Sequence, residues 1–249
     1  MTTSDSTMHE HRFCASLDTE GNQAINATGV RERAALLNAA FWGKGVKLRV
    51  SFMGGTLELQ RRVAALAQAW PDQTRANFSF DFLIGDGQDP AEGDIRIAFE
   101  QGKGSFSRLG RYAQNVDRRE KTMNLGWMTM ALAEDQARAV VLHEFGHALG
   151  LVHEHMNPAQ IIDWDKEKVR ADMRKSQGWD DAKIDANMFH RYDTSTVFGT
   201  DIDPASIMMY PIPPGWTKNG FTVGFNTVLS EVDKALILKV YGPRTVFGG

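Results

Sequence analysis

The first half of the chain changes repeatedly between helical and strand-like hydrophobic patterns. Apolar residues recur at steps of three and four in the segments 30–41 and 59–70, which predicts a helix for each. Three other segments, 46–52, 78–84 and 95–99, alternate apolar with polar positions, which predicts half-buried strands. The order of strand, helix, strand and strand indicates a twisted sheet backed by helices.

Capping residues predict where the helices of this half begin and end. Thr56 is placed to cap the helix over 59–70, and Pro71 is expected to end it. A further helix is predicted over 135–149, because Gly150 follows it at the position where a left-handed C-terminal cap usually lies.

The second half of the chain has a less regular pattern. Residues 156–228 are rich in Asp, Asn, Pro, Gly and aromatic side chains without sustained periodicity, so we expect loops and short helices. A last helix is predicted from Ser230, which resembles a capping pair with Asp233, to a stop at Gly242. Residues 1–28 show no hydrophobic period and are predicted to form a loosely structured lead.

The amino-acid composition limits which binding partners the protein is expected to have and where in the cell it is expected to act. The 249 residues are 42% hydrophobic and 24% charged, which is typical of a soluble globular protein. A net charge of -3 argues against a nucleic-acid or anionic-membrane partner, since both favour a basic face. The chain has no apolar run long enough to cross a bilayer and a polar, acidic N-terminus where a signal peptide would be basic and apolar. We therefore expect a cytoplasmic protein or one exported by a non-classical route.

Four of the seven histidines fall in one short segment, HEFGHALGLVHEH, at residues 143–155. His143 and His147 are four residues apart, so a helix aims both imidazoles at a single point. Gly150 lets the chain turn, and His153 can return as a third ligand. Three imidazoles and a water form a tetrahedral site with an open position, which predicts one catalytic zinc ion per chain. The alternative is a buried helix that happens to be rich in histidine, and the fixed spacing of three His and a Gly argues against it.

The residues around these histidines have separate predicted roles. Glu144 follows the first ligand, so its carboxylate can reach a zinc-bound water and act as general base without occupying the metal. His155, two residues past the third ligand, is predicted to lie in solvent or beside the ligands. The remaining histidines, His9, His11 and His190, are predicted to be ordinary surface or packing residues.

The segment from His143 to His153 resembles the zinc signature of the metzincin metallopeptidases. A second stretch, SIMMY at residues 206–210, resembles the Met-turn of the astacin-like members of that group. The resemblance implies that Met208 is the turn methionine beneath the zinc. It also implies that Tyr210 can ligate the resting metal and stabilise the oxyanion. Glu154, directly after the third histidine, matches the extended family signature.

The resemblance extends over about residues 30–242 and implies an α+β, metzincin-like fold. The implied fold has a twisted mixed sheet and an active-site helix in an N-terminal lobe, about 29–150. The resemblance also implies a loop-rich C-terminal lobe, about 151–249, that ends in a helix, and a single metallopeptidase domain over residues 29–249. It further implies that GSFSRLG, residues 104–110, forms the edge strand that binds an extended peptide. The implied substrate-binding residues are Ser105, Phe106, Ser107, Arg108 and Leu109.

The chain departs from the family pattern at three places. Paired cysteines are common in animal astacins, whereas Cys14 is the only cysteine here, so no internal disulfide is expected. The residues after the signature are HMNPAQ in place of the usual Arg and Asp-Arg-Asp, and Met209 stands where the Met-turn often has His. Because some metzincins are kept latent by a propeptide cysteine on the zinc, Cys14 in the lead also suggests latency.

Together these features predict a zinc-dependent endopeptidase that cleaves peptide or protein substrates, with Glu144 as general base and then general acid. Two alternatives stay open at this point. One is a non-catalytic scaffold that binds a partner in the same cleft, although such proteins generally lose the base or a ligand. The other is zinc-dependent hydrolysis of an amide that is not a peptide.

Overall fold

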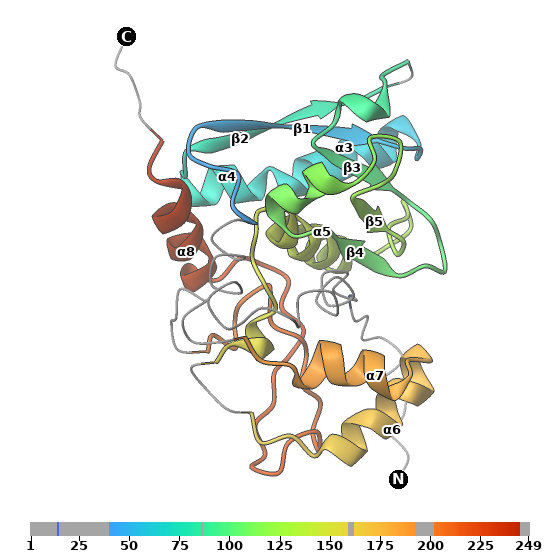
Figure 1. The fold of residues 1–249 in the computed structure, drawn as a ribbon, viewed down its shortest axis with the longest axis vertical. Helices are drawn as coiled ribbons and strands as arrows, with labels where there is room; N and C mark the ends of the chain where they lie inside the picture. The colour runs from blue at the N-terminus through green and yellow to red at the C-terminus, as the bar shows by residue number, and fades with distance from the viewer. Residues whose placement is uncertain (1–13, 15–39, 86, 159–161, 193–201, 245–249) are drawn as a thin grey trace.

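The computed structural model describes residues 14, 40–85, 87–158, 162–192 and 202–244. Their strands form one five-stranded sheet in the order β2-β1-β3-β5-β4 (Figure 1). Pairs within β2, β1, β3 and β5 are parallel, and β4 pairs antiparallel with β5. The predicted mixed sheet and α+β class are confirmed. The strands are β1 Val46–Phe52, β2 Phe78–Leu83, β3 Ile95–Ala98, β4 Ser105–Ser107 and β5 Met123–Leu125.

Helices pack against this sheet, and further short helices occur in the second half of the chain. The α-helices are α3 Leu57–Ala67, α4 Ala69–Thr74, α5 Glu134–Ala148, α6 Lys166–Gln177, α7 Asp181–Ile184 and α8 Glu231–Tyr241. The shorter helical turns are η1 Pro90–Glu92, η2 Gly110–Asn115, η3 Glu154–Met156 and a π-helix, η4 Asp185–Phe189. The loops and short helices expected for the second half are therefore present in its described residues.

The helix ends follow the predicted caps, with one correction. Thr56 caps α3, since its side chain accepts a hydrogen bond from the backbone of Leu59 at 3.2 Å. Pro71 does not end this helical region as predicted, because it lies in the first turn of α4. The N–H groups of a first helical turn have no partner inside the helix, so a proline there costs no hydrogen bond.

The prediction of half-buried strands is wrong for β3. All four of its residues are buried, and Arg96 is 0% exposed. The Arg96 guanidinium donates to four backbone carbonyls, those of Gly93, Val116, Asp117 and Glu120. A buried cation is tolerated here because its donors are satisfied, so a polar position in an alternating pattern need not face solvent.

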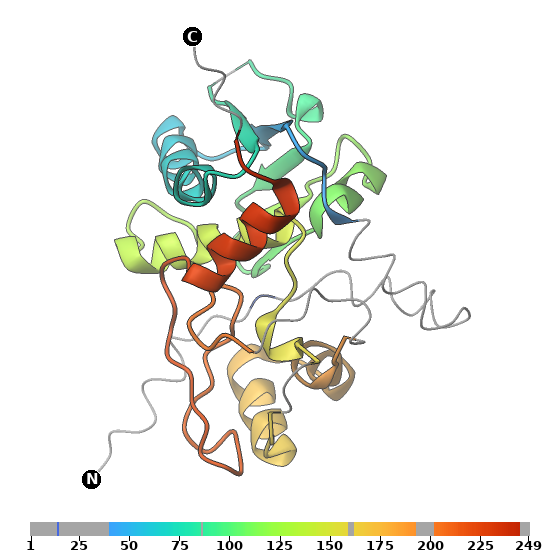
Figure 2. The ribbon, with the colours of Figure 1, turned by 90° about the vertical axis from the view of Figure 1, so that its left-hand side faces the viewer.

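The described residues form two large hydrophobic clusters, and the histidine segment contributes Phe145, Ala148, Leu149 and Leu151 to the larger one. The larger packs α3 and α5 against the sheet, and the smaller gathers the residues around α6, α7 and the following loops. Helix α5 lies between the sheet and the loop-rich part (Figure 1). Helix α8 packs against α4 (Figure 2), and Tyr241 at its end donates a 2.8 Å hydrogen bond to the carbonyl of Leu149, just past α5. The last helix therefore supports the end of the histidine-bearing helix.

Some predictions fall outside the described residues. The lead over 1–28 does so except for Cys14, and the helix predicted over 30–41 does so except for its last two residues. His9 and His11 are also outside.

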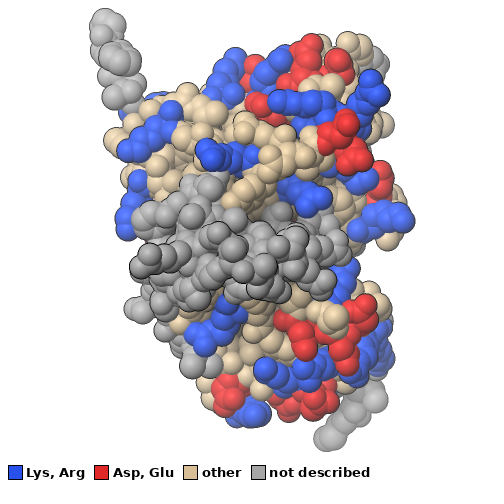
Figure 3. All heavy atoms as spheres, viewed as in Figure 1, with Lys and Arg blue, Asp and Glu red and all other residues tan. Residues whose placement is uncertain are grey.

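Among the described residues, no helix is long and apolar enough to cross a membrane. Basic and acidic side chains are interspersed on the face seen in Figure 3.

Candidate active site

The end of α5 sets the geometry of the histidine cluster. His143 and His147 lie one turn apart on α5, and the helix closes with two reverse hydrogen bonds, from Gly150 N to His147 O at 2.8 Å and from Leu151 N to Gly146 O at 3.0 Å. This pairing is a Schellman motif, and it requires the left-handed backbone that Gly150 adopts at φ 100°. The chain then reverses and brings His153 back to the helix.

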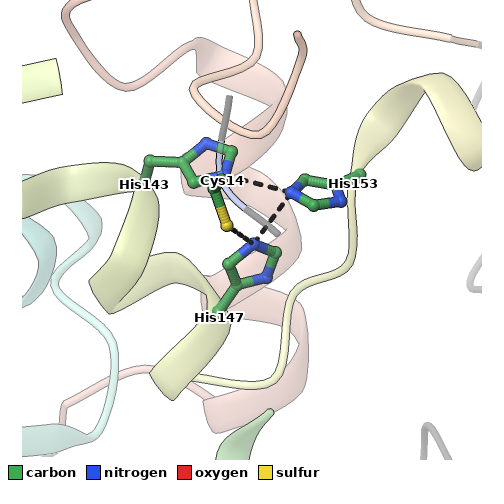
Figure 4. A group of neighbouring side chains, drawn as sticks. All are labelled: Cys14, His143, His147 and His153. Atoms are coloured by element: carbon green, nitrogen blue, oxygen red, sulfur yellow. Dashed lines mark hydrogen bonds between the residues drawn. The ribbon is translucent and has the colours of Figure 1, made fainter. Parts of the chain in front are cut away.

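The three histidines point their Nε2 atoms at one another (Figure 4). The Nε2 atom of His153 lies 3.2 Å from that of His143 and 3.0 Å from that of His147. Nitrogen ligands about 2.0–2.1 Å from a tetrahedral zinc lie about 3.3 Å apart. The spacing of the three nitrogens therefore fits a tetrahedral metal ion.

Hydrogen bonds behind the rings select the tautomer that binds metal. The Nδ1 atoms of His143 and His147 lie 2.8 Å from the carbonyl oxygens of Ile207 and Leu151. A carbonyl only accepts, so each Nδ1 carries the proton and each Nε2 presents a lone pair to the centre. Burial lowers the pKa of His143 to about 4 and that of His147 to about 3, so both rings are neutral at pH 7. This donor set suits a borderline-soft dication such as zinc.

Glu144 lies beside the three nitrogens and is almost fully buried. Burial raises the pKa of its carboxyl to about 8, an effect that its contact with Cys14 partly offsets. A bound dication would favour the ionised form and oppose this shift.

The segment 206–210, which resembles a Met-turn and is called the Met-turn below, packs against α5. Met208 packs against the backbone of Gly146, and the backbone N–H of Glu154 donates to the Met208 carbonyl at 3.0 Å. The turn is fixed from the other side by Asp233, whose carboxylate accepts from the Ser206 hydroxyl at 2.6 Å and from the Ile207 N–H at 2.8 Å. Asp233 also completes the predicted capping box of α8 with Ser230, which is confirmed.

Tyr210 follows this turn and enters the histidine cluster. Its ring centroid lies 4.4 Å from that of His153 and 6.2 Å from that of His143. Burial raises the pKa of the Tyr210 hydroxyl well above its ordinary value, so the hydroxyl stays protonated and can donate.

His155 is also buried, where it packs against Tyr210 and forms a hydrogen bond with the carbonyl of Asn187. The prediction placed His155 either in solvent or beside the ligands, and the solvent-exposed position is wrong.

Cys14 lies in the same cluster, although it is 130 positions away from Glu144 in the chain. One donor atom from each of Cys14, His143, His147 and His153 lies within 4.8 Å of the others. The thiol Sγ is 3.6 Å from His147 Nε2 and 3.7 Å from Glu144 Oε2, and the Tyr210 hydroxyl donates to the Cys14 carbonyl. Cys14 thus contacts three of the residues predicted to carry the chemistry.

The predicted substrate strand is only partly a strand. β4 covers Ser105 to Ser107 and is the last strand of the sheet within the described residues, whereas Arg108 lies beyond it and Leu109 packs with Ala40. Arg108 N donates to Thr122 O at 2.8 Å. Because hydrogen-bonded pairs alternate along an antiparallel ladder, the backbone groups of Ser105 and Ser107 point away from β5.

Two hollows share Trp127 as part of their walls, and the smaller of them borders the cluster. A cleft of about 860 Å³ runs between β4 and the junction of α6 with α7, with Phe106, Trp127 and Trp179 among its lining. Trp127 also borders a smaller cavity of about 40 Å³ beside Glu144. The remaining walls of this cavity are mostly apolar and comprise Ala139, Val140, Ile207, Met209, Pro211, Phe225 and Asn226, together with Cys14, His143 and Tyr210.

Sequence reasoning did not locate this small cavity. Its walls come from α5, from the Met-turn and from the loop at 225, which are distant in the chain. Asn226 joins two of these parts by donating to the carbonyls of Pro204 and Ser206, both at 2.8 Å. No local pattern in the sequence marks these residues as neighbours.

Glu154 forms hydrogen bonds with residues of the loop-rich C-terminal part of the chain. Its Oε1 atom accepts hydrogen bonds from the Asn157 side chain at 2.9 Å and from the backbone of Asp203 at 3.1 Å. Burial raises the pKa of this carboxyl to about 7. Its contacts therefore join η3 to the segment that leads into the Met-turn.

The fold, the three converging histidines and the buried glutamate define the metzincin class of metalloendopeptidases. A comparison with protein families matches residues 55–242 to the Astacin peptidase family. The chain belongs to the astacin family, whose members are zinc metallopeptidases, and it acts on peptide or protein substrates.

Solved structures agree with this assignment. One, described as the structure of myroilysin, is 37% identical with a TM-score of 0.78, over 84% of this chain and 98% of that one. A crystal structure of myroilysin is 32% identical with a TM-score of 0.64, over 97% of this chain and 98% of the other. Comparison with curated proteins finds no match.

Proposed function

We propose that the protein is a zinc endopeptidase in which His143, His147 and His153 hold the metal and Glu144 is the general base. The observation that carries this proposal is the set of three Nε2 atoms, 3.0 and 3.2 Å apart, beside a buried carboxyl group. Zinc in this position would polarise a peptide carbonyl and lower the pKa of water.

Glu144 moves the proton in the proposed reaction. Its carboxylate takes a proton from the attacking water and delivers it to the amine that leaves. The Tyr210 hydroxyl, which is protonated and directed into the cluster, donates a hydrogen bond to the oxyanion that develops on the peptide carbonyl. Met208 supports the ligands from below by packing against α5.

We propose that an extended peptide pairs with β4. The outward backbone groups of Ser105 and Ser107 offer a donor and an acceptor each, and the neighbouring cleft has room for a chain of several residues. The small apolar cavity beside Glu144 would receive the side chain next to the scissile bond. Its described lining contains no Lys or Arg, which favours small apolar side chains over acidic ones.

We also propose that Cys14 keeps the enzyme latent. A thiolate is a strong zinc ligand, and its sulfur lies among the three histidines where the reacting water would have to stand. The same residue engages Tyr210 through its carbonyl. One residue therefore blocks both the open metal position and the hydroxyl that would stabilise the oxyanion.

Cleavage of a diverse peptide mixture, followed by mass spectrometry, tests the proposed activity. Zinc-loaded Cys14→Ser should cut peptides, whereas Cys14→Ser combined with Glu144→Gln should bind zinc with the same stoichiometry and cut none. Turnover by the Glu144→Gln protein would contradict the role of Glu144. Equal specific activity of wild type and Cys14→Ser would contradict latency.

The same experiment separates the two other functions. A binding scaffold would hold zinc and bind peptides without cutting them in the Cys14→Ser protein. A hydrolase for other amides would leave the peptide mixture intact but release amine from small acyl-amide substrates in a Glu144-dependent way.

A further inference from the structure

Three aromatic rings pack together on one side of the metal-binding cluster. The ring centroids of Tyr210 and His155 are 4.4 Å apart with planes inclined by 26°, which is a stacked arrangement. His153 lies 4.4 Å from Tyr210 and 5.3 Å from His155. Tyr210 is therefore held between a predicted metal ligand and a histidine that has no predicted role in the chemistry.

His155 is itself firmly anchored. It is 2% exposed, and its Nε2–H donates to the carbonyl of Asn187 at 2.7 Å. Asn187 lies in the π-helix η4 and is fixed by a 2.9 Å hydrogen bond from its side chain to the Lys183 carbonyl. π-Helical turns are rare and are frequent at functional sites. This one aims a backbone carbonyl at the imidazole and so sets the plane of the ring.

The chemistry of His155 argues against simple packing. Its Nδ1 atom is buried and has no hydrogen-bond partner in the described part of the chain. An unpaired buried nitrogen is unfavourable, and a phenylalanine would fill the same space without it. An imidazole tied to Asn187 differs from phenylalanine in that its orientation is fixed.

We propose that His155 is a positioning residue for Tyr210, and that the chain from η4 through Asn187 and His155 holds the tyrosine hydroxyl directed at the substrate carbonyl. The proposal rests on the role of Tyr210 in the proposed function. Because the stacked ring limits sideways motion of Tyr210, its loss should slow the reaction without weakening substrate or metal binding.

A double-mutant cycle between His155 and Tyr210 tests this proposal. His155→Ala and Tyr210→Phe are prepared singly and together in the zinc-loaded full-length Cys14→Ser protein, and kcat and KM are measured on one cleaved peptide. An aromatic pair of this kind corresponds to a fall in kcat of roughly 3- to 10-fold for His155→Ala, with KM nearly unchanged. In the Tyr210→Phe background, His155→Ala should cause little further loss.

Conservative variants separate the two parts of the interaction. His155→Phe keeps the ring without the hydrogen bond to Asn187 that sets its plane, so it should recover only part of kcat. His155→Gln keeps a donor for Asn187 without the ring and should resemble His155→Ala. His190→Ala is a matched control, since His190 packs on Tyr192 and should leave kcat unchanged.

The outcomes distinguish this inference from the proposed function. If His155→Ala lowers kcat equally in both backgrounds, or acts by loss of zinc, the positioning role is refuted while the function stands. If Tyr210→Phe alone turns over at the parent rate, Tyr210 leaves the mechanism and the positioning role fails with it.

Discussion

Gly146 is the residue of α5 that lets the Met-turn approach the metal-binding helix, and Gly146→Ala tests this contact. A Cβ atom built on Gly146 would overlap the sulfur of Met208 and lie 3.2 Å from a ring carbon of Trp70. Met208 is 2% exposed and Trp70 is 0% exposed, so neither side chain has free space into which to move.

Two opposing effects determine whether Gly146→Ala raises or lowers the free energy of unfolding. Alanine is favoured over glycine inside a helix by about 1 kcal/mol. Overpacking of a well-packed core costs about 1–3 kcal/mol, and two enclosed neighbours place this site toward the upper end. The expected net loss in the free energy of unfolding is therefore about 1–2 kcal/mol, which lowers Tm by roughly 2–8 °C for a chain of this size.

The assay is thermal unfolding followed by circular dichroism, with zinc content measured in parallel. Zinc affinity should also fall, because His147 follows Gly146 and its backbone shifts with the helix. Combining Gly146→Ala with Met208→Ala should cost less than the sum of the two single changes, because the smaller side chain leaves room for the methyl group. A rise in Tm for Gly146→Ala would refute the reasoning, since it would mean that helix propensity dominates.

Three further changes follow from other contacts. Arg96→Leu should lower the free energy of unfolding by about 1–3 kcal/mol, as judged by urea denaturation, because the buried Gly93 carbonyl and three partly buried hydrogen bonds lose their donor. Asp233→Asn should cost about 1–3 kcal/mol by the same measurement, because the carboxylate accepts charge-assisted bonds from Ser206 and Ile207; Tm equal to that of wild type would contradict this. Phe225→Arg should shift cleavage toward peptides with an acidic residue beside the scissile bond, and an unchanged product profile would exclude Phe225 from the specificity pocket.

The histidine segment is the part of the molecule that the sequence predicts best. Its predicted ligands lie within eleven residues, and their approach depends on helix periodicity and on one glycine at φ 100°. Both are local properties, so spacing alone predicts the convergence of His143, His147 and His153. The capping box of α8 is local in the same sense.

Elements that depend on tertiary context are harder to predict. β4 and β5 have three residues each, too few for an alternating pattern to emerge, and only family resemblance points to β4. The alternation in β3 predicts a solvated face, yet Arg96 is buried because distant carbonyls receive its donors. Pro71 is expected to stop a helix but lies where a helix has no hydrogen bond to lose.

The residues proposed to bind the metal lie close together in the chain. The residues proposed to control the reaction come from distant segments. The proposed ligand set is built by one helix and the turn after it. By contrast, Tyr210 and its support from Asn187 through His155 come from later segments, and Cys14 comes from the lead. Substitutions in those segments should therefore change rate, selectivity or latency while the zinc content stays constant. Zinc stoichiometry and turnover measured together on each variant would separate the two groups of residues.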